Sequence, residues 1–114
     1  LDDMVRAGFD AINPISPLCR MNLAEVKEKY GDKITLYAGL SVKMPPEGKV
    51  NTAEYNDILY GRDIKKKLEA LAYTVRIAAP GGGFIFQRIA RGYTEEQRLY
   101  MKAWERLRRY PIQA

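Results

Sequence analysis

FDAIN at Phe9–Asn13 is the first of three short apolar runs that decide the fold, and it is followed by ITLYA at Ile34–Ala38 and FIFQ at Phe84–Gln87. Each run ends in a break and is followed by a segment with the apolar spacing of an amphipathic helix. Strands that alternate with helices indicate parallel pairing in an α/β fold. The sequence therefore predicts about three successive strand–helix (βα) units.

The helices are predicted from their apolar spacing and their caps. Arg62–Ala79 has the strongest pattern, because one helix face is apolar at positions 64, 68, 71 and 75. Asn22 and Thr94 are expected to cap the first free amides of two further helices. A short helix is expected at Thr52–Tyr60.

Proline and glycine mark the expected breaks between these elements. Asn13-Pro14 is expected to end the first strand, because proline cannot donate a hydrogen bond to the ladder. Gly81–Gly83 lies between a helix and a strand, whereas a phosphate-binding loop needs a strand before the glycines and a helix after them. We therefore expect a tight helix-to-strand turn at Gly81–Gly83.

Composition restricts the classes of protein to which the chain can belong. Its 114 residues suffice for one domain, with the 46% hydrophobic and 29% charged residues of an ordinary globular protein. No apolar run approaches the length of a membrane span, so no membrane partner is expected. The chain has no histidine and one cysteine, Cys19, so no metal site is expected and a reducing, cytoplasmic location is favoured.

The net charge of +5 is unevenly distributed, since residues 1–61 carry −2 and residues 62–114 carry +7. A basic half can bind nucleic acid or a polyanionic ligand. The cations lie mostly on the polar faces of predicted helices, as at Lys65, Lys66, Lys67, Arg106, Arg108 and Arg109. No nucleic-acid-binding motif accompanies them, so we expect solvated helix faces and no nucleic-acid partner.

Four stretches of the chain carry a family resemblance. They are GFDAINPI (8–15), LAEVKEKYGDKITLYAGLS (23–41), APGGGFIF (79–86) and YTEEQRLYMKAWER (93–106). Their order and spacing resemble the C-terminal third of the uroporphyrinogen decarboxylase family, apart from an apparent insertion around Val42–Gly61. The resemblance implies that residues 1–114 form a partial domain, the C-terminal portion (about three βα units) of a TIM-type (β/α)8 barrel.

The resemblance also implies one of two activities. One branch of the family decarboxylates the acetate side chains of uroporphyrinogen in porphyrin and heme biosynthesis and uses no cofactor. The other branch comprises zinc-dependent methyltransferases that act with corrinoid proteins. The decarboxylases carry a histidine near the position of Ala90, the methyltransferases carry a cysteine zinc ligand in about the same region, and this chain has neither there. The resemblance therefore supports the fold better than either activity.

The candidate site lies at the carboxyl ends of the strands, where βα barrels place their active sites. Arg88 and Arg91 could clamp substrate carboxylates through paired hydrogen bonds, or they could be ordinary surface residues. Gln87, Asn13 and Ser41 are further candidate substrate-binding residues, and Asn13 is alternatively a turn former. The expected ligand is a tetrapyrrole or another small molecule, and no catalytic residue is assigned.

Asp10 and Cys19 each have a functional and a structural interpretation. Asp10 lies among apolar residues of the first predicted strand, where a buried carboxyl with a raised pKa would suit acid–base chemistry. The structural alternative is an edge or capping residue paired with a neighbouring loop. Cys19 follows the same strand, where a zinc-ligand role competes with that of a free packed or exposed cysteine.

Three functional hypotheses follow. The chain is expected to be a fragment of a uroporphyrinogen decarboxylase-like carboxy-lyase, with a corrinoid- and zinc-dependent methyltransferase or a non-catalytic, degenerate family member as alternatives. A partial parallel sheet leaves strand edges and apolar surface uncovered. We therefore expect either a missing N-terminal portion or self-association of the chain.

Overall fold

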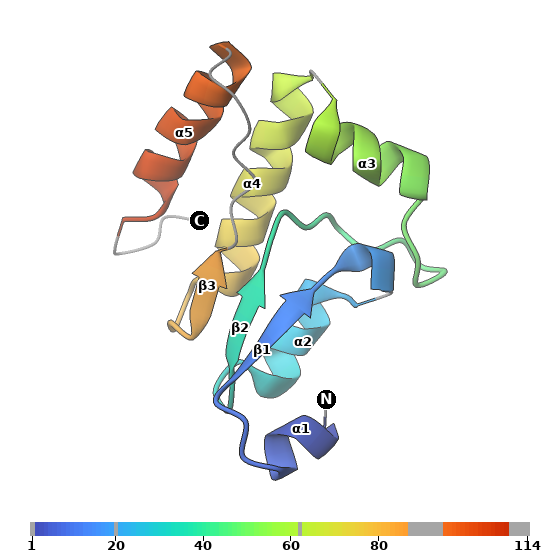
Figure 1. Ribbon diagram of the computed structural model, residues 1–114, viewed down its shortest axis with the longest axis vertical. Coiled ribbons are helices and arrows are strands. Elements are labelled where there is room, and N and C mark those ends of the chain that lie inside the picture. Colours follow the sequence, from blue (N-terminus) through green and yellow to red (C-terminus); the bar gives the residue numbers. More distant parts are fainter. Residues whose placement is uncertain (1, 20, 62, 87–94, 110–114) are drawn as a thin grey trace.

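A parallel sheet of three strands forms the centre of the structure (Figure 1). The computed structural model describes residues 2–19, 21–61, 63–86 and 95–109. Its strands are β1 (Ala11–Ile15), β2 (Thr35–Ala38) and β3 (Phe84–Phe86), which pair in the order β1-β2-β3. The predicted α/β class with parallel strands is therefore confirmed.

Helices connect and flank the strands. The α-helices of the described residues are α1 (Asp2–Arg6), α2 (Leu23–Tyr30), α3 (Thr52–Tyr60), α4 (Ile64–Ala78) and α5 (Glu95–Leu107), and a 3₁₀ helix, η1, spans Pro17–Cys19. Helix α2 joins β1 to β2, α3 and α4 both lie between β2 and β3, and α5 follows β3. None of these described helices combines the length and the apolar character that a membrane crossing needs.

Side-chain caps explain where three of the helices begin. The side chain of Asn22 accepts hydrogen bonds from two backbone amides in the first turn of α2, as the sequence predicts. Asn51 and Asp63 each accept a hydrogen bond from a first-turn amide of α3 and α4. Helix α4 therefore begins two residues later than predicted, at Ile64. The predicted cap Thr94 lies outside the described residues.

The predicted bounds of the first strand are wrong. Strand β1 begins two residues later than predicted and continues through Pro14 instead of ending at Asn13, while Phe9 is 55% exposed. Its register with β2 shifts between Ile12 and Ile15. Three residues of β1 advance against two of β2 over this interval, which is a bulge, and a bulge can hold a residue that has no N–H.

Helices α2 and α4 cover the same face of the sheet. One core cluster joins both helices to the strands: Ile12 and Ile15 of β1, Leu36 and Ala38 of β2, Leu23 and Val26 of α2, and Ala78 of α4. Figure 1 shows these two helices behind the strands. The main core therefore lies between one face of the sheet and these two helices.

Helix α5 extends this layer of helices along the side of α4. A second core cluster joins Leu40, just beyond β2, to Leu71 of α4 and Tyr100 of α5. Trp104 of α5 stacks on Phe86 of β3, with ring centroids 4.7 Å apart. The helices therefore follow one another in the order α2, α4, α5, just as the strands follow one another in the order β1-β2-β3.

The opposite face of the sheet, here called the open face, carries no helix among the described residues. On β2, the half-buried Thr35 and Tyr37 alternate with the buried Leu36 and Ala38. Ile85 of β3 stands opposite Tyr37 in the register and is 45% exposed. Side chains alternate between the faces of a strand, so the open face comprises Ala11, Asn13, Thr35, Tyr37 and Ile85. A parallel sheet is normally covered on both faces.

The predicted helix-to-strand turn at Gly81–Gly83 is confirmed. All three residues have positive φ, at 83°, 78° and 71°, a conformation that is readily available only to glycine. A Cβ on Gly83 would lie 3.1 Å from the backbone oxygen of Gly31, whereas a Cβ on Gly81 would meet no atom within 4 Å. The Lys27 ammonium also donates to the backbone oxygen of Gly82 at 2.6 Å. The turn therefore packs against α2 and against Gly31, the residue that follows α2.

Gly83→Ala is expected to lower the free energy of unfolding by about 2 kcal/mol and Gly81→Ala by about 1 kcal/mol. Both variants place alanine at positive φ and restrict the unfolded chain equally, but only Gly83→Ala adds the close contact with the oxygen of Gly31. Urea unfolding of the two variants measures the difference. Equal losses would contradict the close approach of the turn to α2.

Candidate functional site

The carboxyl end of the sheet is formed by the ends of the three strands and by the segments that follow them. Strand β1 leads into η1, and β2 leads into the stretch Gly39–Ser41. Because the strands are parallel, these segments lie at one edge of the sheet. Figure 1 shows α3 near the same end of the molecule, beside α4.

The structure describes two of the five predicted site residues. Asn13 is exposed in the bulged part of β1, and Ser41 is 2% exposed three residues beyond β2. No hydrogen bond joins these two described residues to each other. Gln87, Arg88 and Arg91 lie outside the described residues, so their assignment stays a prediction.

Ser41 is held in place by a buried threonine of α4. The backbone N–H of Ser41 donates to Thr74 Oγ1 at 2.7 Å. The same hydroxyl lies 3.2 Å from the backbone oxygen of Ser41 and 2.7 Å from that of Ala70, and its single proton serves one of them at a time. Thr74 has no exposed surface. This contact fixes the chain to α4 soon after it leaves β2.

The preceding residue, Leu40, is held by a tyrosine of α3. The buried hydroxyl of Tyr55 donates to the backbone oxygen of Leu40 at 2.5 Å. Burial raises the pKa of Tyr55 to about 12, and the neighbouring Tyr60 contributes to the shift. The hydroxyl therefore keeps its proton and remains a donor at neutral pH. We call the contacts of Tyr55 and Thr74 with residues 40–41 the β2 clamp.

The β2 clamp was not predicted from the sequence. Its two contacts join residues 15 and 33 positions apart, so neither belongs to a local pattern such as a cap or a turn. A threonine inside a helix is a weak signal, because its hydroxyl commonly bonds to the backbone one turn earlier, as Thr74 does with Ala70. Only the fold brings these groups together.

Asp10 and Cys19 are both exposed. Asp10 lies in a bend before β1 and not within the strand, because β1 begins at Ala11. The alternative of a buried carboxyl suited to acid–base chemistry is therefore wrong for Asp10. Cys19 ends η1 as a free thiol. Within the described ranges, no three histidine, cysteine, aspartate or glutamate side chains gather where they could hold a metal ion.

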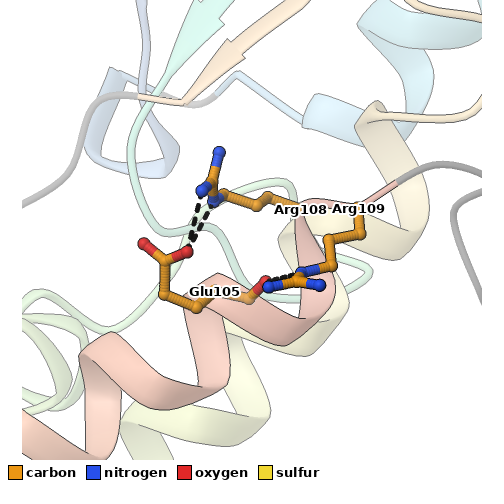
Figure 2. Close-up of polar contacts among 3 residues, drawn as sticks. All are labelled: Glu105, Arg108 and Arg109. Carbon is orange, nitrogen blue, oxygen red and sulfur yellow. Dashed lines mark hydrogen bonds and ion pairs between the residues drawn. The ribbon is translucent and has the colours of Figure 1, made fainter.

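The described basic residues of the second half lie largely on exposed helix surface. Arg108 donates to the carboxylate of Glu105 at 3.1 and 2.8 Å, and Arg109 Nε donates to the backbone oxygen of Glu105 at 3.2 Å (Figure 2). Lys66 of α4 pairs with Asp57 of α3 at 3.6 Å. These cations have partners within the same helix or a neighbouring one, which agrees with the interpretation of solvated helix faces.

Comparison of the chain with models of protein families, with curated proteins and with solved structures found no match. No relatives inform the function, which is therefore inferred from features of this chain. They are a parallel sheet with helices on one face, an open face on the other side, and a clamped segment at the carboxyl end of the sheet.

Tyr55→Phe is expected to lower the free energy of unfolding by about 1–3 kcal/mol at pH 7, because the buried oxygen of Leu40 loses its donor. The pKa of Tyr55 is raised on folding, so its contribution to stability is complete below the ordinary tyrosine pKa of about 10. That contribution is lost as the pH rises toward about 12.

Urea unfolding at pH 7 and across pH 10–12 measures both effects, with Tyr73→Phe in α4 as the control. The wild-type protein should lose more stability than Tyr55→Phe over the alkaline range. Equal stability of the wild type and Tyr55→Phe at pH 7 would contradict the proposed role of the hydroxyl.

Proposed function

We propose that the chain forms three successive βα units of a (β/α)8 barrel, and that this barrel is a uroporphyrinogen decarboxylase-like carboxy-lyase. In this proposal the carboxyl end of the sheet contributes to a binding site for a polycarboxylate tetrapyrrole. The exposed thiol of Cys19 supports the proposed cytoplasmic location, because free thiols persist in reducing compartments.

The observation that carries the barrel proposal is the placement of α2 and α4 on one face of strands in sequential order. In a doubly wound sheet the strand order reverses, and helices cover both faces. In a barrel each strand is added on the same side of the previous one, so every crossover helix lies on the outside. Three units in the order β1-β2-β3 with α2, α4 and α5 on one side match the barrel arrangement.

The open face supports the same proposal. Tyr37 and Ile85 are neighbours in the register of β2 and β3. Thr35 lies two residues before Tyr37 on the same face of β2. The interior of such a barrel is filled by inward-pointing side chains from all strands. In the proposed barrel, further strands would cover the open face and pair with the outer edges of β1 and β3.

The proposed activity rests on the sequence resemblance and on the place of the candidate residues. Ser41 follows β2, and Arg88 and Arg91 follow β3 in the sequence. Asn13 lies in the middle of β1 on the open face and not at the end of the strand. A guanidinium binds a carboxylate through two parallel hydrogen bonds. These arginines are proposed to bind and orient the carboxylates of the substrate. The substrate is then held so that the positive charge that develops on the pyrrole lies where the protein can stabilise it.

Uroporphyrin is expected to bind the full-length protein, and Arg88→Ala and Arg91→Ala are each expected to weaken binding by about tenfold through loss of a charged hydrogen-bonding partner. Arg108→Ala is the matched control, because Arg108 is exposed and already paired with Glu105. Fluorescence titration at fixed ionic strength measures the dissociation constants. Coproporphyrin, which lacks the acetate carboxylates, should bind more weakly.

Turnover of uroporphyrinogen and zinc content then separate the three hypotheses. Decarboxylation by the wild-type protein without added metal is the expected result. Bound zinc with methyl transfer would replace the proposal by the methyltransferase alternative, and porphyrin binding without turnover would favour the non-catalytic alternative. Failure of both porphyrins to bind would contradict a tetrapyrrole site altogether.

A further inference from the structure

Of the two helices between β2 and β3, α3 buries the smaller part of its surface. Of its nine residues, Tyr55 is the buried one, whereas α4 buries five residues along its length. Local unfolding is favoured where few apolar groups are buried and the backbone hydrogen bonds face solvent. Helix α3 is therefore expected to open at a lower cost than α4.

Among the described residues, one buried hydrogen bond and two half-buried apolar side chains attach α3 to the core. The hydroxyl of Tyr55 donates to the oxygen of Leu40, and the half-buried Ile58 and Leu59 pack against the core cluster that contains Leu40. The ion pair between Asp57 and Lys66 is more than half exposed on both side chains, and exposed pairs of this kind contribute little. The hydrogen bond of Tyr55 is thus a contact, shielded from solvent, between α3 and the segment that follows β2.

Helix α3 is joined to its neighbours by an irregular stretch before it and by a sharp turn after it. The stretch that joins β2 to α3, residues 39–51, contains turn and irregular structure but no helix or strand. At the other end Gly61 leaves the helix in an extended conformation, with φ −77° and ψ −176°. A Cβ on Gly61 would collide with the backbone oxygen of Asp57, so glycine is required for this sharp exit toward α4.

The other half of the β2 clamp does not depend on α3. Thr74 belongs to α4 and binds the backbone of Ser41 directly. Release of Tyr55 would therefore leave Ser41 attached to α4. Because the two contacts involve different helices, α3 can move while the segment after β2 stays in place.

We propose that α3 is a lid that detaches as a unit from α4 and from the end of β2, with Tyr55 as its latch. Opening breaks the hydrogen bond between Tyr55 and Leu40 and uncovers the oxygen of Leu40 and the apolar surface under Ile58 and Leu59. It leaves the sheet, α2 and α4 unchanged. This motion gives access to the carboxyl end of β2, and it uses contacts within this chain alone, whatever ligand the site takes.

Hydrogen exchange of the full-length protein at pH 7, followed by mass spectrometry in increasing low concentrations of urea, tests the lid. Backbone amides of α3 should exchange at least about tenfold faster than those of α4, with little dependence on urea, because local opening exposes little surface. Tyr55→Phe should raise exchange in α3 by about a further tenfold through loss of one hydrogen bond. It should leave exchange in α2 unchanged.

Tyr73→Phe removes a tyrosine hydroxyl from α4 and serves as the matched control, with no expected change in α3. The wild-type measurement stands by itself if Tyr55→Phe fails to fold. Equal exchange rates and equal urea dependence in α3 and α4 would show that α3 opens only when the whole protein unfolds. That result would overturn the proposal, as would an effect of Tyr55→Phe spread equally over α3 and α4.

Discussion

The burial of one face of β2 is the constraint on which the rest of the structure depends. Leu36 and Ala38 have no exposed surface, because α2 and α4 pack on them from the same side. Strand β2 is hydrogen-bonded on both edges, to β1 and to β3. The larger elements of the described structure therefore contact either β2 or a helix that packs on β2. The half-buried Tyr37 on the other side of the same strand shows that this cover is one-sided.

One-sided cover links the fold to the proposed function. A parallel sheet with only one covered face exposes side chains and strand edges that other strands can complete. The contact of Thr74 with Ser41 fixes the chain to α4 next to the carboxyl end of the sheet, and the contact of Tyr55 with Leu40 adds to it while α3 is in place. A segment that is rigid at its base and continues into a long irregular stretch is suited to present groups to a ligand.

Local sequence patterns predicted much of the fold, and long-range contacts account for what they missed. The cap at Asn22 and the turn at Gly81–Gly83 depend on neighbouring residues, and both are present as predicted. The predicted end of β1 is wrong, because a bulge accommodates a proline within a strand, and the bulge follows from the pairing of β1 with β2.

The same distinction applies to the candidate site. The sequence places Ser41 after a strand, and the structure confirms that place. Its burial was not foreseeable, since it follows from Thr74, 33 residues away. The interpretation of Asp10 as a buried carboxyl depends on its lying within the strand, but the strand begins after it and leaves it exposed. Position along the chain was thus predictable, whereas the surroundings of each side chain depended on packing.

Thiol labelling of the open face tests the central claim most directly. In a Cys19→Ser background, the account predicts that the thiol of Ile85→Cys reacts at least about tenfold more slowly in the native full-length protein than the thiol of Lys65→Cys on the exposed surface of α4. Unfolding in urea should abolish the difference. Equally fast labelling of the two native variants would show that the open face is bare to solvent, and would contradict a barrel that covers it.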